Sequence, residues 1–302
     1  MSKLAVVHLV RAANGTFPYK AFLDSYLANP GGREHDLVIL LKGFESEPAT
    51  RQYLKPLQGI RHRIVQVTDK GLDLTAYEAA VAQLPDYDYY CFLNSFSVLK
   101  DPLWLDKLFG YASRADVGIV GATGSYQSVL TDVRTGLLFD DRDFGHLPRY
   151  KKAVIFGHQL LIVARTAIAF PPFPNYHIRS NAFLLSARVL RMIRWPDVRT
   201  KLDAYRFESG RRSLTQQALQ IGKRAIVVGR DGVGYDKEQW VFSNTFWQRD
   251  QANLLVEDNQ TRQYSQGDAD TRTRLSRYAW GKDLTATEGL DARVRSDSWE
   301  RG

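Results

Sequence analysis

One segment combines a carboxylate with two arginines: RFESGRRSLTQQALQIGKRAIVVG. Glu208 precedes a predicted helix over Ser213–Gly222, and a carboxylate within ~3 Å of a hydroxyl group can remove its proton as a general base. The guanidinium groups of Arg211 and Arg212 suit the binding of phosphate oxygens. The alternative is that Glu208 stabilises a helix start or forms an ion pair with one of these arginines.

A second polar group alternates along the segment NYHIRSNAF and consists of His177, Arg179 and Asn181. Alternate residues of a strand point to the same face, so this spacing predicts one polar surface beneath a bound ligand. Arg179 is a further candidate for contact with a phosphate group. In the alternative interpretation, one or two of these side chains only satisfy carbonyl groups of the surrounding loop.

Polar residues also follow several predicted strands of the first half: Arg11, Asn14, Asp69, Asn94 and Ser95. Because parallel sheets bind ligands beyond the carboxyl ends of their strands, we expect these side chains near a ligand. Asn14 has the alternative role of supplying only the conformation of a turn. Asp73 directly precedes a predicted helix and is interpreted as its N-cap.

The elements that position these residues follow from short apolar runs that alternate with helical patterns. The predicted strands are Leu4–Val10, Asp36–Leu41, Arg63–Val67, Tyr89–Leu93 and Val117–Gly121. The predicted helices between them are Phe17–Leu27, Ala49–Leu57, Leu74–Leu84 and Trp104–Ala112. This alternation is typical of an α/β fold with a mostly parallel sheet that helices cover on both faces.

The later part of the chain is less regular. Asp140–Lys152 is predicted to be a mobile polar loop, and Ala153–Ile168 a helix. The run NAFLLS and Arg224–Gly229 are predicted strands, and Thr271–Trp280 is a predicted last helix.

We divide the chain into a main domain (1–230), an irregular aromatic-rich extension that packs on it (231–283) and a tail (284–302). The tail is charged and almost free of large apolar residues, which predicts disorder.

Composition limits the classes of protein to which the chain can belong. The sequence has no apolar run of ~18 residues, and its short N-terminal apolar stretch indicates a strand, not a signal peptide. The single cysteine, Cys91, cannot form an internal disulfide, which fits a cytoplasmic protein. The net charge of +8 is spread along the chain without a nucleic-acid motif, so we expect phosphate-bearing ligands and no nucleic acid. Peripheral contact with the inner face of a membrane is compatible with this charge.

From about Ala5 to Gly229, the order of these features resembles a GT-A glycosyltransferase, similar to family 2. The resemblance rests on the runs FLDSYL and DLVILL, on Lys42-Gly43 and Asp69-Lys70-Gly71, and on DYDYYCFLNSFSVLKDPLWLDKL. It implies a Rossmann-like domain that binds a nucleotide sugar.

In that family, the strand that corresponds to YYCFL ends in an acidic D-x-D motif, which holds a divalent cation beside the donor diphosphate. This chain has Asn94-Ser95-Phe96 there, with no carboxylate at either outer position. The resemblance therefore assigns no metal ligands and leaves Mn²⁺ or Mg²⁺ without a clear site. The candidates for binding the diphosphate in place of a cation are Arg179, Arg211 and Arg212.

The family also carries an acidic pair before a helix, and Glu208 and Ser209 stand at the corresponding positions. The resemblance implies that Glu208 is the base of an inverting transfer to an acceptor hydroxyl. The donor-binding residues assigned in this way are Arg11, Asn14, Asp69, Asn94, Ser95 and the three arginines. The acceptor-binding residues are His177, Asn181 and Trp240, whose alternative role is packing within the extension.

The implied reaction moves a sugar from a nucleotide-activated donor to a glycan or lipid-linked glycan, in bacterial surface polysaccharide biosynthesis. Two alternatives stay open at this point. The first is a catalytically degenerate protein of the same fold that binds nucleotide sugars or has a regulatory role. The second, which rests on charge alone, is a binder of nucleic acid or phosphorylated lipid.

Overall fold

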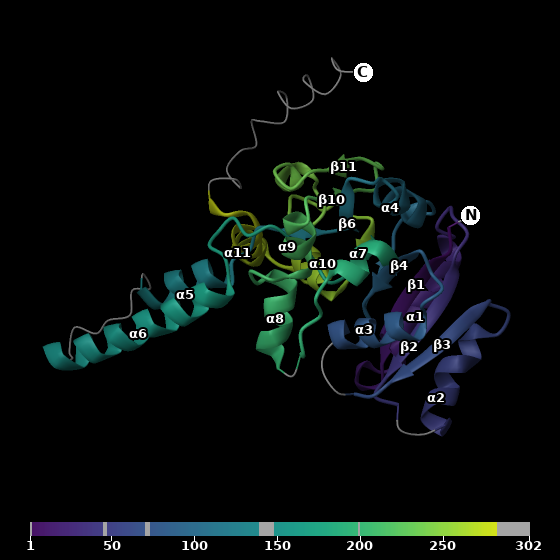
Figure 1. The fold of residues 1–302 in the computed structure, drawn as a ribbon, viewed down its shortest axis with the longest axis horizontal. Coiled ribbons are helices and arrows are strands. Elements are labelled where there is room, and N and C mark those ends of the chain that lie inside the picture. The colour runs from purple at the N-terminus through teal and green to yellow at the C-terminus, as the bar shows by residue number, and fades with distance from the viewer. Residues whose placement is uncertain (1, 45–46, 70–72, 139–147, 199, 283–302) are drawn as a thin grey trace, which may run out of the picture.

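The computed structural model describes residues 2–44, 47–69, 73–138, 148–198 and 200–282. Within this part, an eight-stranded sheet runs through the centre of the molecule (Figure 1). Its strands are β1 (Leu4–Arg11), β2 (Asp36–Lys42), β3 (His62–Val67), β4 (Tyr89–Leu93), β6 (Val117–Gly121), β9 (Phe183–Ser186), β10 (Arg224–Val228) and β11 (Gly234–Tyr235).

The strand order is β11-β10-β6-β9-β4-β1-β2-β3. The strands β3, β2, β1 and β4 are parallel, as are β6 and β10, whereas β9 is antiparallel to both of its neighbours. The predicted α/β class with a mostly parallel sheet is therefore confirmed. Two short pairs lie outside this sheet: β5 (Val98–Leu99) with β12 (Val256–Glu257), and β7 (Gly124–Ser125) with β8 (His177–Ile178).

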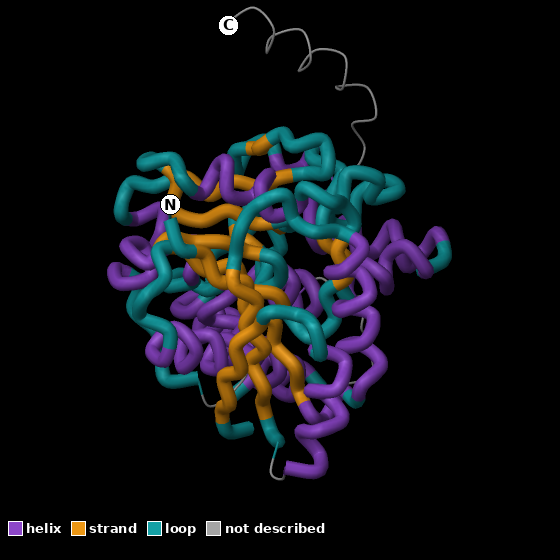
Figure 2. The backbone as a smooth tube through the Cα atoms, turned by 90° about the vertical axis from the view of Figure 1, so that its right-hand side faces the viewer, coloured by secondary structure: helices purple, strands orange, loops and turns teal. Residues whose placement is uncertain are grey.

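Helices surround the strands, as the two views of the backbone show (Figures 1 and 2). The helices are α1 (Thr16–Ala28), α2 (Glu47–Leu54), α3 (Asp73–Gln83), α4 (Trp104–Ala112), α5 (Val129–Leu138), α6 (Arg149–Ala169), α7 (Ala187–Met192), α8 (Lys201–Ser209), α9 (Leu214–Gln220), α10 (Asn259–Gln266) and α11 (Ala269–Trp280). Helices α1, α2 and α4 contribute to one core cluster, and α3 and α7 to α11 contribute to the other.

The alternation of β1 explains why both faces of the sheet must be covered. Val7 and Leu9 belong to the core with α3, whereas Val6 and Val10 point the opposite way, into the core with α1. Successive residues of a strand point to opposite faces, and here both faces are apolar. Cys91 is fully buried in β4, as expected for a cysteine in an apolar run.

His8 is the exception in this apolar strand. Its ring stacks on Phe22 of α1 with 3.5 Å between the ring centroids, and both of its ring nitrogens lack a hydrogen-bond partner within the described structure. Burial lowers the pKa of His8 to about 3, so the ring is neutral at physiological pH.

Some local expectations were wrong. Residues 149–152 of the predicted loop form the first turn of α6, which begins directly after Pro148; residues 139–147 lie outside the described part. The sequence pattern gave no sign of α5, and it also missed α8 and α10. The last two each begin with a capping box, from Thr200 and Asp203 in α8 and from Asp258 and Thr261 in α10, and these boxes are readable in the sequence.

The C-terminal extension is irregular and aromatic, and it shares the main core. Asn244, Trp247, Arg249 and Gln251 all have positive φ angles, while Trp240 is fully buried in the cluster that contains the sheet. The extension also supplies β11 to the edge of the main sheet. The division into three units stays a prediction, and the tail 284–302 lies outside the described residues. No described helix has both the length and the apolar character that crossing a membrane requires.

Candidate functional site

The candidate site lies where the strand order reverses, beside the carboxyl ends of β1, β2 and β4. Consecutive strands run outward from β1 to β3, and β4 lies on the other side of β1. The connections after β1 and β4 therefore leave the sheet in different directions, the arrangement beside which open α/β sheets bind ligands. Arg11 and Asn14 are at or just after the end of β1, and Asn94 and Ser95 follow β4, whereas Asp69 follows β3.

The first group of charges forms around Arg11, the last residue of β1. Its guanidinium Nη2 lies 4.0 Å from Asp69 Oδ1, and its Nη1 lies 3.7 Å from Asp73 Oδ1. Burial raises the pKa of Asp73, whereas the positive charges of Arg11 and Lys42 oppose that rise. Burial likewise lowers the pKa of Lys42, the last residue of β2. The predicted donor residues Arg11 and Asp69 are thus brought together.

Gly43 explains how Asp69 approaches the end of β2. The glycine has a φ of 76°, in the left-handed region, and a β-carbon there would lie 3.1 Å from Asp69 Cγ. Both the backbone conformation and the close contact favour glycine at this position. Asp73, which the sequence indicated as an N-cap, is the first residue of α3, and its carboxylate faces Arg11.

The positions of the missing D-x-D motif form a compact turn after β4. The backbone N–H of Asn94 donates to Asn181 Oδ1 at 3.0 Å. The side-chain oxygen Oδ1 of Asn94 accepts from the backbone N–H of Phe96 at 2.9 Å. The Ser97 hydroxyl donates to the same Asn181 oxygen at 2.6 Å. Ser95 is buried, and its hydroxyl has no hydrogen-bond partner within the described residues. Asn94 and Asn181 therefore hold the turn in place.

A carboxylate from far along the chain completes this turn. Asp258 is buried, and its Oδ1 accepts from the amides of Gln260 and Thr261 as the N-cap of α10. Its Oδ2 accepts from Asn94 Nδ2 at 3.4 Å. The pairing of β5 with β12 places this segment beside the turn. The sequence gave no sign of the contact between Asp258 and Asn94.

The second group of charges centres on Glu208, in the last turn of α8. Its Oε1 lies 3.4 Å from Arg179 Nη1 and accepts a long hydrogen bond from the amide of Ser180, also at 3.4 Å. The side chains of Glu208 and Arg179 are only 15% and 20% exposed. On its other side, the guanidinium carbon of Arg179 lies 5.0 Å from the ring centroid of Phe246. A cation–π contact and an ion pair thus orient Arg179.

The two groups of charges are electrostatically coupled. Burial is the main cause of the raised pKa of Asp73, and the negative charge of Glu208 raises it further. The positive charges of Arg11 and Lys42 lower it. Both Arg179 and Glu208 act on His177, whose pKa is lowered to about 4, first by burial and then by Arg179. Arg11, Lys42 and Glu208 are therefore close enough to Asp73 for their charges to affect its protonation.

The predicted polar face shared by His177, Arg179 and Asn181 does not form. The strand β8 ends at Ile178, and the chain then turns, with Ala182 at a φ of 50°. Asn181 consequently contacts the β4 turn, Arg179 contacts Glu208, and His177 is buried with Nδ1 2.8 Å from the carbonyl oxygen of Asn175.

Several other candidates lie in unexpected surroundings. Asn14 ends a single 3-10 turn, and the positive φ angle belongs to the next residue, Gly15. The Arg211 Nε donates to the carbonyl oxygen of Ala167 in α6 at 3.0 Å, and Arg212 is exposed. The ion-pair partner that the structure gives Glu208 is Arg179, not either of these arginines.

The acceptor-stacking candidate Trp240 has no exposed surface, and its indole N–H donates to the carbonyl oxygen of Tyr235 at 3.0 Å. In this conformation the ring presents no free face to a sugar, so its role here is packing, the alternative that the sequence left open.

The residues at the β4 turn do not fit a divalent cation. Asp258 is the carboxylate that contacts the turn, one of its oxygens caps α10, and the oxygen of the Asn94 amide is already an acceptor. Among the described residues, no group of three or more His, Cys, Asp or Glu side chains is arranged to hold a metal.

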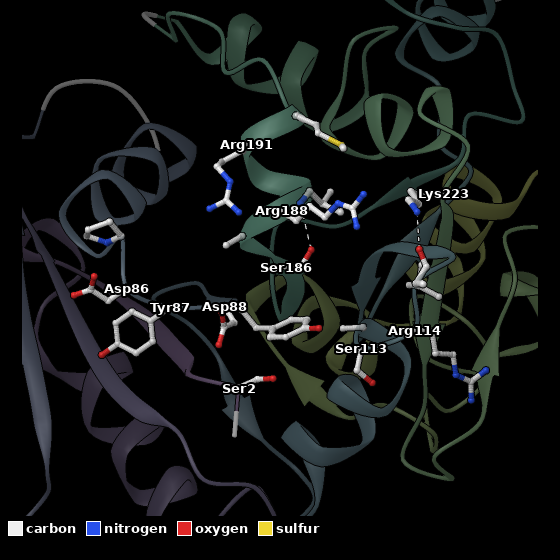
Figure 3. A pocket seen from close by; sticks show the side chains of 18 residues that line it. Ser2, Asp86, Tyr87, Asp88, Ser113, Arg114, Ser186, Arg188, Arg191 and Lys223 are labelled. Carbon is white, nitrogen blue, oxygen red and sulfur yellow. Dashed lines mark hydrogen bonds between the residues drawn. The ribbon is translucent and has the colours of Figure 1, made fainter.

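A cavity of about 690 Å³ lies at the opposite ends of the strands (Figure 3). It is lined by the residues before β4 and β6 and by α7, with Asp86, Asp88, Arg114, Arg188 and Arg191 among its charged side chains. Amino ends of parallel strands are not where such sheets bind ligands, so this cavity is not part of the site.

No protein-family model matches the chain, and no curated protein matches it significantly. Solved structures do resemble it. A mannosyltransferase, PcManGT from Pyrobaculum calidifontis in complex with GDP-Man and Mn²⁺, has a TM-score of 0.45 and 14% identity over 75% of this chain and 54% of that chain.

Two further structures are similar over shorter regions. TarS of S. aureus in complex with UDP-GlcNAc has a TM-score of 0.33 and 13% identity, over 40% of this chain and 34% of that chain. The bifunctional glycosyltransferase WbbM has a TM-score of 0.35 and 14% identity, over 63% and 32%. The match therefore spans about a third to a half of those proteins. Likeness at this level concerns the fold and does not identify an activity.

Proposed function

We propose that the chain is a glycosyltransferase of the GT-A type, which transfers a sugar from a nucleotide-activated donor to a hydroxyl of a glycan or lipid-linked glycan. The observation that supports this most directly is the pair of Glu208 and Arg179, partly buried beside the charged residues that follow β1 and β3. A potential base and a potential phosphate ligand lie together at the sheet edge where α/β proteins bind ligands.

In this proposal, Arg11 and Asp69 contact the nucleoside of the donor. Asp69 is suited to hydrogen bonds with hydroxyl groups because its side chain is 63% exposed and its position is constrained by Gly43. Arg179 binds the diphosphate, since a guanidinium group pairs with two phosphate oxygens at once. Without a donor, Glu208 satisfies the same guanidinium group, so donor binding exchanges one anionic partner of Arg179 for another.

That exchange leaves the Glu208 carboxylate free to act as a base. The acceptor oxygen attacks the anomeric carbon while its proton passes to Glu208. The bond between that carbon and the diphosphate oxygen breaks, and its electron pair leaves with the diphosphate. Arg179 stabilises the charge that develops there, a role that needs no reorganisation because the side chain is already held by Phe246. Attack from the face opposite the leaving group inverts the anomeric centre.

The substitution Glu208→Gln tests this assignment. We expect donor affinity no lower than that of the wild type, because the substitution removes the anion that competes for Arg179, and transfer reduced by roughly 10²–10⁴-fold, the usual contribution of a general base. Donor binding is measured through the rise in melting temperature with a panel of nucleoside diphosphates and their sugars. Glu34→Gln, at an exposed carboxylate on the loop before β2, is the matched control and should retain activity. Wild-type turnover in Glu208→Gln would exclude this residue as the base.

A catalytically degenerate protein that binds nucleotide sugars is the second candidate. It is favoured by the β4 turn, in which Asn94-Ser95-Phe96 stands where the family that the sequence resembles has its metal-binding carboxylates, and Asn94 binds Asn181 instead. The same assay separates the two candidates. Stabilisation of the wild type by one nucleotide without transfer to any acceptor supports the degenerate protein.

A further inference from the structure

Helices α5 and α6 form an arm that projects from the rest of the molecule (Figure 1). The two helices pack against each other, but α6 is the longer, with 21 residues against 10. Because α5 covers one side of α6, the other side must face either solvent or a partner. The composition of that side indicates which partner it suits.

One side of α6 is marked by buried or half-buried residues three or four positions apart, and we infer that it is the side that packs on α5: Ile155, Gln159, Ile162 and Thr166. The opposite side is apolar and exposed. Among the described residues, sixteen large apolar side chains are exposed, and six of them are on α6: Tyr150, Val154, Phe156, Leu160, Leu161 and Ile168. Val154 and Ile168 are 70% and 78% exposed. We call Tyr150, Val154, Leu160, Leu161 and Ile168, which lie opposite the α5 contact, the α6 stripe.

The ionisable side chains that border this face of α6 are basic. Residues 149–169 contain Arg149, Lys151, Lys152, Arg165 and one histidine, and no aspartate or glutamate. Lys151, His158 and Arg165 follow one another at intervals of seven residues, close to two helical turns. They therefore form an exposed row along one edge of the α6 stripe.

An apolar face bordered by cations is complementary to an anionic lipid surface, into which such a helix sinks its apolar side chains while its cations meet the headgroups. A second copy of the chain fits less well, because two α6 helices packed antiparallel through this face would bring rows of like charge together. Crossing the membrane is also excluded for α6, which lacks the required apolar character. We propose that the α6 stripe binds the surface of an anionic phospholipid bilayer.

The arm is joined to the candidate site. At the end of α6, the carbonyl oxygens of Ala167 and Ala169 accept hydrogen bonds from the Nε and the amide of Arg211, at 3.0 and 2.9 Å. Arg211 lies three residues after Glu208. A bilayer under α6 would thus lie near the segment that carries Glu208. This consequence rests on the proposed function and suits a lipid-linked acceptor, whereas lipid binding by α6 does not depend on it.

Flotation of the full chain with vesicles tests the proposal. We use vesicles of phosphatidylcholine alone and vesicles with equal parts phosphatidylglycerol, and expect binding to the anionic vesicles only. The triple substitution of Val154, Leu161 and Ile168 to Ser should weaken that binding by tenfold or more. The pair Lys151→Gln and Arg165→Gln should weaken it by roughly tenfold and flatten its salt dependence.

Controls separate lipid binding from misfolding and from catalysis. Phe17→Ser removes a side chain that is 84% exposed on α1 and should leave vesicle binding unchanged, as should Glu208→Gln. Each variant must keep the melting temperature of the wild type within a few degrees. If the triple serine variant unfolds, the variant with Lys151→Gln and Arg165→Gln still tests the proposal, because it alters only exposed polar groups. Equal binding to neutral and anionic vesicles, no binding by the wild type, or a dimer that the serine substitutions dissociate would overturn the proposal.

Discussion

Replacing His8 with leucine should remove a defined part of the acid sensitivity of the protein. His8 lies in the middle of β1 against Phe22, without a hydrogen-bond partner for either ring nitrogen within the described structure, and burial lowers its pKa to about 3. In the unfolded chain, the pKa of a histidine is near 6.5. As the pH falls below this value, His8 is protonated in the unfolded state but stays neutral in the folded state. The free energy of unfolding therefore decreases until the pH reaches the pKa of His8 in the folded state.

The magnitude follows from that difference. At about pH 5, protonation of the unfolded histidine lowers the free energy of unfolding by about 2 kcal/mol, whereas at about pH 7.5 the effect is below ~0.1 kcal/mol. The figure for pH 5 hardly depends on how far the folded pKa lies below that pH. His177, with a pKa lowered to about 4 mainly by burial, acts in the same direction and stays in both proteins.

Urea unfolding of the wild type and of His8→Leu at these two pH values measures the effect. We expect the wild type to lose about 2 kcal/mol more than the variant on acidification, because the contributions of the other titrating groups cancel in the comparison. His158→Gln, at an exposed histidine on α6, should behave as the wild type does. Parallel losses in the wild type and His8→Leu would mean that His8 is not buried as a neutral ring.

Four further predictions concern the site. Gly43→Ala should destabilise the fold by about 1–2 kcal/mol and weaken donor binding, because φ is 76° and the new methyl group would meet Asp69; both are read from chemical denaturation and nucleotide-induced thermal shifts. Asp258→Ala removes the cap of α10 and should cost about 1 kcal/mol of stability. Asp268→Ala, which removes the equivalent cap of α11, should cost a similar amount and is the matched control. Only Asp258→Ala should also reduce nucleotide binding, because Asp258 contacts Asn94. In a double-mutant cycle of Arg179→Gln and Glu208→Gln, a coupling energy of about 1–3 kcal/mol is expected from unfolding experiments, and additive effects would contradict a direct ion pair. Transfer activity should survive EDTA because the β4 turn offers too few carboxylates for a cation; complete loss that manganese restores would show that other ligands hold one.

The sequence by itself determined the parallel core of the fold and the end of the sheet at which to look. The runs of β1, β2 and β4 are apolar at consecutive positions, which is sufficient to predict strands buried on both faces. Because parallel strands align their carboxyl ends, the proximity of Arg11 to Asp69 also follows without any tertiary information. The missing carboxylates at Asn94-Ser95-Phe96 are likewise a property of the sequence alone.

Only the tertiary structure decided which charges and amides meet. Glu208 has two arginines three and four residues away, yet its ion-pair partner in the structure is Arg179, because the turn after β8 places that residue against the end of α8. Asp258 reaches Asn94 across 164 residues through the pairing of β12 with β5. Which side of α6 is exposed depends on the packing of α5 against it, and the sequence alone does not determine this. The periodicity of the sequence does not predict such contacts, because they depend on how elements that are distant in the chain pack together. A partly buried charge then pairs with the partner that this packing brings close.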